Sequence, residues 1–243
     1  MKISAIILAK NEAARIGKCL ESVSWADERI VIDNGSTDDT AKIAKRLGAR
    51  VINSSEKSFA ERRNLGLKES KGDWVLYVDA DEIVTPELAK EIQTLKQPAA
   101  GYFIRRKNFY LGHLWPFTEN ILRLFKKSAL KNWYGDLHES PNVEGQIGQL
   151  KNPLLHYTHR TLEEMVTKTN EWSETEAILR LASGHPPVVA WRLFRVMTTA
   201  FFDSYIKQSG WRAGTVGLIE SIYQAFSMFL TYAKLWELQN KKQ

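Results

Sequence analysis

The chain has little cysteine, no long apolar run and no block of basic residues. Cys19 is its one cysteine, so an intramolecular disulfide is excluded, and this composition fits a reducing compartment. In the aromatic C-terminal part the longest uncharged stretch, residues 221–233, is shorter than the roughly 20 apolar residues that cross a bilayer. We therefore expect a protein without a membrane-spanning helix.

The net positive charge of the chain indicates which kinds of binding partner to expect. With 34 lysines and arginines against 28 aspartates and glutamates, the net charge of +6 suits nucleic acid, anionic lipid or phosphorylated substrates. Zinc-finger spacing, an RNA-binding aromatic motif and an arginine-rich block are all missing, so nucleic acid is not an expected partner. Residues 1–12 have too short an apolar part, and a charge too early, for a signal peptide, and we expect them to form the first strand of a cytoplasmic domain.

Short apolar runs alternate with capped helices over residues 1–95, which predicts an α/β fold with a mostly parallel sheet flanked by helices. The expected strands cover residues 3–8, 29–32 and 74–78, and the expected helices cover 12–23 behind an Asn11 cap, 36–48, and 58–69 behind a capping box of Ser58 and Glu61. Two β-rich pieces, residues 102–104 and 121–124, continue the sheet on either side of an aromatic loop.

We expect two parts: a catalytic domain over residues 1–185 and a helical, aromatic-rich and basic region over residues 186–243. From Pro186 onward the chain has seven lysines and arginines against three aspartates and glutamates. Its apolar residues recur at helical spacing but cover more than a narrow stripe. Two roles fit this region: packing of the helices on each other, or peripheral contact with a membrane, the basic residues facing anionic lipid.

The most informative segment is residues 74–82, where an apolar run ends in Asp79, Asp81 and Glu82. Apolar residues without alternation indicate a strand covered on both faces, and open α/β sheets bind ligands beyond the carboxyl ends of such strands. Crowded carboxylates repel one another unless a cation joins them, and oxygen ligands favour Mg²⁺ or Mn²⁺ that also binds phosphate. The segment therefore predicts a metal-diphosphate site, with a solvated acidic turn as the alternative.

Two further turns end at the same predicted edge of the sheet. The first carries Ala9, Asn11 and Glu12 at a helix N-terminus, where free amides favour an anion or the edge of a base. The second carries Asp33 and Asn34, either of which can accept a hydrogen bond from the imide of uracil. Ordinary helix capping is the alternative for both turns.

Two arginines and a histidine complete the candidate site. The adjacent guanidinium groups of Arg62 and Arg63 can grip a diphosphate bidentately, although one of them can equally be solvated. His156, near the end of an expected strand, can complete the shell of a metal ion, and a structural histidine is the alternative.

Four ordered motifs between residues 6 and 82 carry a family resemblance. They are Ile-Ile-Leu-Ala-Lys-Asn-Glu, Val-Ile-Asp-Asn-Gly-Ser-Thr-Asp, Arg-Arg-Asn-Leu-Gly and Leu-Tyr-Val-Asp-Ala-Asp-Glu. In this order they resemble the nucleotide-sugar half of family 2 glycosyltransferases of the GT-A fold. With Tyr-Gly-Asp-Leu-His-Glu at residues 134–139 and the ending at residues 232–238, the chain is most similar to bacterial lipopolysaccharide inner-core β-1,4-glucosyltransferases.

The resemblance implies a Rossmann-like GT-A domain and a role for each matching position. Asp33, together with Asn34, would read the base, Arg63 would contact phosphate, and Asp79 and Asp81 would hold the ribose and the metal. The other residues assigned to the nucleotide-sugar site are Ala9, Asn11, Glu12, Arg62 and Ala80. The Glu-Asp pair that many relatives use in catalysis is missing as such.

Inverting sugar transfer needs a carboxylate that takes the proton of the attacking hydroxyl. Glu139 is the candidate, with Asp136 in reserve; a carboxylate paired with His138 is the alternative for Glu139. A divalent ion held by Asp81 would stabilise the negative charge that develops on the departing diphosphate.

Three functions stay open on the sequence. The leading one is transfer of a hexose, with glucose expected, from a UDP-sugar to a lipid-linked saccharide such as lipopolysaccharide core, on the cytoplasmic face of the inner membrane. A phosphatase of the haloacid dehalogenase type also has two aspartates after a strand, but that strand comes first in the chain. The third is an inactive, membrane-associated scaffold, against which the intact carboxylates and arginines argue.

Overall fold

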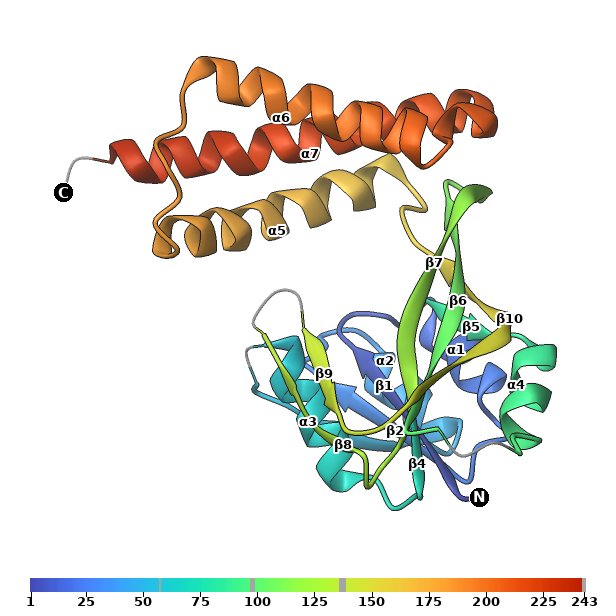
Figure 1. Cartoon of the computed structure of the whole chain (residues 1–243). Coiled ribbons are helices and arrows are strands. Elements are labelled where there is room, and N and C mark those ends of the chain that lie inside the picture. The colour runs from blue at the N-terminus through green and yellow to red at the C-terminus, as the bar shows by residue number, and fades with distance from the viewer. Residues whose placement is uncertain (57, 97–98, 136–138, 242–243) are drawn as a thin grey trace. The chain divides into compact units, whose positions relative to one another are not determined.

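The computed structural model describes residues 1–56, 58–96, 99–135 and 139–241. In this part of the chain, eight strands form one sheet in the order β3-β2-β1-β4-β7-β6-β10-β5, and β8 pairs with β9 separately (Figure 1). The strands are β1 (Ile3–Ala9), β2 (Glu28–Asp33), β3 (Arg50–Asn53), β4 (Trp74–Asp79), β5 (Glu82–Val84), β6 (Gly101–Tyr110), β7 (His113–Lys126), β8 (Leu130–Tyr134), β9 (Ser140–Val143) and β10 (Ile147–Tyr157).

The predicted parallel sheet is confirmed for the first four strands. β1 pairs in parallel with β2 and β4, and β2 with β3, so these strands all end at one edge of the sheet. Beyond β4 the sheet turns antiparallel, because β7 runs against β4 and β5 runs against β10. The mixed sheet with flanking helices is the predicted GT-A-like α/β architecture.

Helices cover both faces of the parallel strands. On one face the core contains Ile7 with residues of α1 (Ile16–Ser22), α2 (Thr40–Arg46) and α4 (Pro86–Gln93). On the other face Ile6 packs in a core with α3 (Phe59–Glu69) and β8. Since alternate residues of β1 face opposite cores, the strand is apolar throughout, which explains why its sequence does not alternate.

Of the predictions for single elements, one is confirmed and two were wrong. The capping box is confirmed, since the Ser58 hydroxyl accepts the Glu61 amide and the Glu61 carboxylate accepts the Ser58 amide. The predicted helix over residues 12–23 was wrong at its start, because α1 begins at Ile16 and its N-cap residue is Arg15. The predicted aromatic loop was also wrong, because β6 and β7 extend through it to a two-residue turn.

A glycine in α3 sets how closely this helix approaches the sheet. A Cβ on Gly66 would lie 2.4 Å from Ile6 Cγ2 in β1. Because buried overpacking typically costs 1–3 kcal/mol, we expect Gly66→Ala to lower the free energy of unfolding by about 2 kcal/mol in urea titrations. Gly17→Ala in α1 is the matched control, since its Cβ would meet only Leu47 Cδ1 at 4.0 Å. An equal effect of both substitutions would contradict this packing.

The chain divides into two compact units, which are described separately. The first comprises residues 1–107 and 119–156, and the second comprises residues 108–118 and 157–243. We predicted a division at residues 185/186; the compact units instead place α5 (Leu162–Ala182) with the C-terminal helices, because α5 packs along α7 (Gly214–Asn240). The functional roles assigned to the two parts stay predictions.

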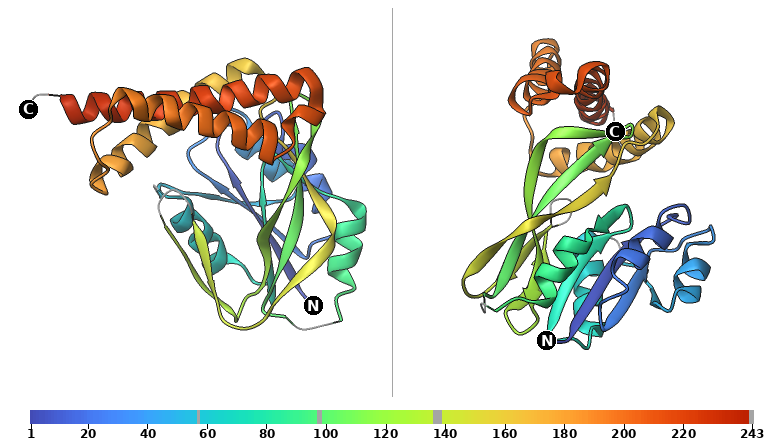
Figure 2. Two further views of the ribbon diagram at one scale, coloured as in Figure 1. Left: turned by 45° about the horizontal axis from the view of Figure 1, so that its top comes forward. Right: turned by 90° about the vertical axis from the view of Figure 1, so that its right-hand side faces the viewer.

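In the second unit, α7 packs against both α5 and α6 (Ala190–Phe202), and the tip of the β6–β7 hairpin joins them (Figure 2). Trp115 is buried and its indole N–H donates to Gln208 Oε1 at 3.1 Å. His159 stacks on Tyr110 and lies 3.1 Å from the buried Glu220 carboxylate of α7. Across the described residues, none of the helices has enough continuous apolar length to span a lipid bilayer.

Candidate functional site

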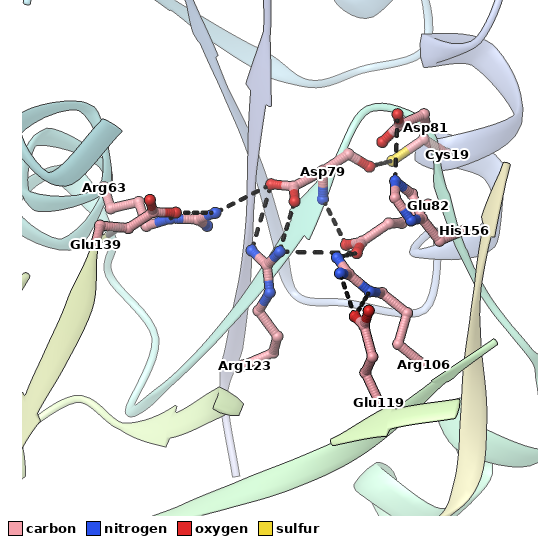
Figure 3. A network of polar contacts seen from close by, with 10 residues as sticks. All are labelled: Cys19, Arg63, Asp79, Asp81, Glu82, Arg106, Glu119, Arg123, Glu139 and His156. Carbon is pink, nitrogen blue, oxygen red and sulfur yellow. Dashed lines mark hydrogen bonds and ion pairs between the residues drawn. The ribbon is translucent and has the colours of Figure 1, made fainter. Parts of the chain in front are cut away.

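The acidic segment leaves β4 in a tight turn at the carboxyl edge of the parallel strands (Figure 3). Glu82 is fully buried, and its Oε2 accepts the Asp79 amide at 2.8 Å. Ala80 is buried between the two aspartates. The turn gives each aspartate different partners, so the three carboxylates do not form one cluster.

Asp79 is held by two arginines. Arg123 of β7 donates to both carboxylate oxygens, at 3.3 and 2.5 Å, and Arg63 of α3 donates to Oδ1 at 3.2 Å. Burial by itself raises the pKa of Asp79, but the charges of Arg123 and Arg63 outweigh it and hold the pKa well below its usual range. Asp79 is therefore ionised at any physiological pH.

Asp81 faces a different side of the turn and lies beside His156 of β10. Its Oδ2 is 3.4 Å from His156 Nε2, and both side chains are largely buried. No group of three or more His, Cys, Asp or Glu side chains among the described residues is arranged to hold a metal by itself. The Asp81 carboxylate and the His156 imidazole are nevertheless oxygen and nitrogen donors of the kinds that bind Mg²⁺ or Mn²⁺, so these two residues would hold such an ion.

Around this turn, acidic and basic side chains alternate in one continuous network (Figure 3). Arg106 of β6 lies 3.3 Å from Glu82 Oε1 and 2.5 Å from Glu119 of β7, and Arg123 lies 3.7 Å from Glu82. Burial raises the pKa of Glu82, against the pull of the arginine charges. In order, the network runs Glu139, Arg63, Asp79, Arg123, Glu82, Arg106, Glu119.

Glu139, the predicted base, ends this network and is paired with Arg63. Its Oε1 accepts from Arg63 Nε at 3.0 Å. Arg63 is buried, with its guanidinium 4.9 Å from the Trp133 ring and 5.5 Å from the Tyr77 ring. Arg63 thus links the acidic turn to the candidate base. Its predicted phosphate contact and the catalytic role of Glu139 stay predictions, and Asp136 lies outside the described residues.

The two adjacent arginines of α3 have separate surroundings. Arg62 donates from Nε to the Glu56 carbonyl at 3.2 Å and lies over the Phe59 ring at 4.6 Å, whereas Arg63 reaches Asp79 and Glu139. The predicted grip of both guanidinium groups on one diphosphate stays a prediction.

Hydrogen bonds tie the turns after β1 and β2 to each other. The Asn11 amide donates to Ser36 Oγ at 2.9 Å, and Asn11 Oδ1 accepts the Thr37 amide at 2.8 Å. The Asn11 backbone is left-handed, with a φ of 55°. Its two hydrogen bonds join the two turns, and Asn11 does not cap a helix. The Asn34 amide donates to the Ala9 carbonyl at 2.9 Å, which extends the parallel ladder by one step.

The remaining predicted residues of these turns are also fixed by local bonds. Asp33 is buried, and its Oδ1 accepts the Ser36 amide at 3.2 Å. The Glu12 amide donates to Thr40 Oγ1 at 2.7 Å, and the Glu12 carboxylate pairs with Arg15. The turns therefore form a preformed rim, and their contacts with a base stay predictions.

The sequence interpretation missed Arg106, Glu119 and Arg123. All three are on β6 and β7; β7 lies beside β4 in the sheet, and β6 lies on the far side of β7. A signal for one of them was present, because Arg123 interrupts the otherwise apolar run Ile-Leu-Arg-Leu-Phe. A buried arginine in such a strand needs a carboxylate partner, and Asp79 supplies it.

Comparison with known proteins assigns the fold and family. Residues 4–144 match the family described as Glycosyl transferase family 2. An uncharacterized glycosyltransferase of Rickettsia prowazekii (strain Madrid E) is 32% identical, with 100% of this chain and 89% of the relative covered. The lipopolysaccharide core biosynthesis glycosyltransferase LpsC of Rhizobium meliloti (strain 1021) is 28% identical, with 98% and 93% covered.

A crystal structure of S. aureus TarS, residues 1–349, has a similar fold, with a TM-score of 0.52 at 16% identity over 100% of this chain and 92% of that one. The structural likeness concerns the fold alone, whereas the sequence match covers more than half of this chain. The chain therefore belongs to glycosyl transferase family 2.

Proposed function

We propose that the protein is an inverting hexosyltransferase that moves a hexose, with glucose expected, from a UDP-sugar to a lipid-linked saccharide such as lipopolysaccharide core. The observation that carries the proposal is the turn after β4, where Asp81 lies beside His156 while arginines hold Asp79 and Glu139. Similarity to LpsC over nearly the whole chain supports the choice of acceptor, and a TarS structure with UDP-GlcNAc supports a UDP-sugar as donor.

In the proposed chemistry, one set of residues acts on the nucleotide-sugar donor and another residue acts on the acceptor hydroxyl. Asp81 and His156 would hold Mg²⁺ or Mn²⁺, which when bound neutralises the charge of the departing diphosphate. Asp79, kept ionised by its arginines, would accept hydrogen bonds from the ribose hydroxyls. Asp33 and Asn34, on the rim after β2, would read uracil. Glu139 would take the proton of the attacking hydroxyl, in an orientation fixed by Arg63.

Family membership favours this reading over the phosphatase, and a direct assay separates them. The protein is incubated with a panel of UDP-sugars and Mn²⁺, with and without membrane glycolipid, while UDP and inorganic phosphate are measured. Acceptor-dependent UDP release supports transfer, whereas free phosphate without sugar transfer points to the phosphatase. UDP binding without turnover on any acceptor would favour the inactive scaffold.

The role of Glu139 is open to a separate test. We expect Glu139→Gln to retain UDP-sugar affinity within about threefold but to lower kcat by about 10³-fold, because the amide cannot accept the proton. Calorimetry with UDP measures the first quantity and acceptor-dependent UDP release the second. Glu144→Gln is a matched control, since this exposed carboxylate pairs with Lys131 and with no other charged group that the structure describes. Normal transfer by Glu139→Gln would move the base assignment to Asp136.

A further inference from the structure

The long helix α7 carries large apolar side chains on its exposed side as well as its buried side. Its buried residues are partly polar, as Glu220, Ser221 and Thr231 are, and partly apolar, as Tyr232 and Leu235 are. The buried polar groups are satisfied: Glu220 contacts His159, and Ser221 Oγ lies 3.0 Å from Ser204 Oγ. The exposed apolar residues of α7 are Leu218, Ile222, Phe226, Phe229 and Trp236. A helix that packs only within a water-soluble bundle normally has a polar exposed side.

On α6 the exposed side combines aromatic with cationic residues. Trp191, Phe194 and Phe202 recur at helical spacing and are 60%, 72% and 55% exposed. Ile206, in the π-helical turn Asp203–Lys207, and Trp211 after it are also exposed, at 53% and 56%. Together these five residues form what we term the α6 face. An exposed apolar surface of this kind marks an interaction site.

The charge around the α6 face is positive. The guanidinium groups of Arg192 and Arg195 lie 5.4 and 5.7 Å from the Trp191 ring, and neither has a carboxylate partner among the described residues. Arg212, beside Trp211, is likewise without an ion pair in that part of the chain. Asp203 is the one acidic residue between 187 and 219, and it is paired with Lys207.

We infer that the α6 face is a docking surface for an anionic phospholipid membrane, which this protein contacts without crossing it. Aromatic side chains with neighbouring arginines match the acyl and headgroup layers of an interface, and the unpaired charge matches anionic lipid. A second copy of the chain fits less well, because a two-fold interface would place Arg192 and Arg195 against their own copies. The inference rests on the proposed function in that a lipid-linked acceptor requires such a surface.

Vesicle flotation of the full chain tests the inference. We expect the protein to float with vesicles of phosphatidylcholine and phosphatidylglycerol, and salt or omission of the anionic lipid to reduce binding. Because basic residues near an anionic surface attract it, reversing two charges with Arg192→Glu and Arg195→Glu should weaken binding by at least about tenfold. Phe194→Ser with Phe202→Ser should weaken it similarly, since both rings are exposed in the free protein.

Matched controls lie in the first unit. Lys18→Glu with Lys45→Glu reverses two exposed charges there, and Phe103→Ser removes an exposed ring; both are expected to float as the wild type does. The inference is overturned if the wild type stays in the aqueous fraction with anionic vesicles, or if the controls lose binding equally. It is also overturned if light scattering shows a dimer that Phe194→Ser with Phe202→Ser dissociates, because the partner is then a second copy.

The same variants separate this inference from the proposed function. With a detergent-dispersed acceptor, the α6-face variants should release UDP at the wild-type rate and lose activity only on vesicle-embedded acceptor. Flotation without UDP release on any acceptor would refute the proposed function and leave the docking surface intact. UDP release without flotation would refute the docking surface and leave the proposed function intact.

Discussion

Asp81→Asn is expected to lower kcat/KM for the UDP-sugar by about 10³-fold, which is about 4 kcal/mol of transition-state stabilisation. Asparagine keeps the size of the side chain but loses the negative charge beside His156, 3.4 Å away. The substitution should mainly weaken the affinity of the protein for the cation. Raising the Mn²⁺ concentration should therefore recover part of the activity. Steady-state UDP release across a Mn²⁺ titration measures both effects.

The control for this substitution is Asp73→Asn, at the opposite end of the β4 segment, where the exposed carboxylate accepts the Lys2 amide at 3.3 Å. Thermal unfolding should be nearly unchanged in both variants, because Asp81 is outside the network of arginines that holds Asp79. If Asp81→Asn keeps half the wild-type activity with the same Mn²⁺ dependence, Asp81 is not the residue that holds the cation.

The parallel half of the fold could be predicted because its signals are local. Apolar runs ending in polar turns define β1, β2 and β4, and right-handed crossovers bring their carboxyl ends to one edge. The capping box of α3 fixes where that helix starts, and Arg63 follows one turn later. The convergence of Asp33, Asp79 and Asp81 on one edge therefore follows from short-range patterns alone.

The partners of these carboxylates depended on long-range topology. Arg123 reaches Asp79 because β7 inserts antiparallel beside β4, and Arg106 reaches Glu82 from β6, the next strand of the sheet. Nothing near Asp79 in the sequence specifies these neighbours. Asn11 was assigned to a helix cap because its residue type suits one. Instead its amide donates to Ser36 of another turn and its side-chain oxygen accepts from the Thr37 amide, which stabilises a left-handed backbone. In both cases tertiary contacts outweighed local propensity.

A consequence of this topology is that the site contributes to the stability of the fold. Three arginines from α3, β6 and β7 meet Asp79 at the end of β4 and the buried Glu82 of β5, so five elements are joined by charge. Removing one member of such a set leaves its partner desolvated and unpaired, which costs more than the pair itself contributes. We expect the loss of Arg123 to destabilise the fold most, because its guanidinium group binds both carboxylate oxygens of Asp79.

Arg123→Met is accordingly expected to lower the free energy of unfolding by about 3–5 kcal/mol at pH 7. Asp79 has a depressed pKa in the folded protein, so its stabilising contribution is present above its unfolded pKa of about 3.9 and is lost as the pH falls through the folded value. The difference between wild type and variant should therefore be largest near neutral pH and shrink below about pH 4.

Urea titrations from pH 3 to pH 7 measure this difference. The control is Arg105→Met, which removes the exposed arginine that precedes Arg106 in β6. Adding Asp79→Asn to Arg123→Met should restore part of the lost stability, because it removes the unpaired charge. Arg123→Lys should fall between wild type and Arg123→Met, since lysine keeps the charge but cannot bind both oxygens with a planar fork. A loss below about 1 kcal/mol for Arg123→Met, independent of pH, would show that the pair does not stabilise the fold, and Asp79 would then be free to exchange Arg123 for a ligand at little cost.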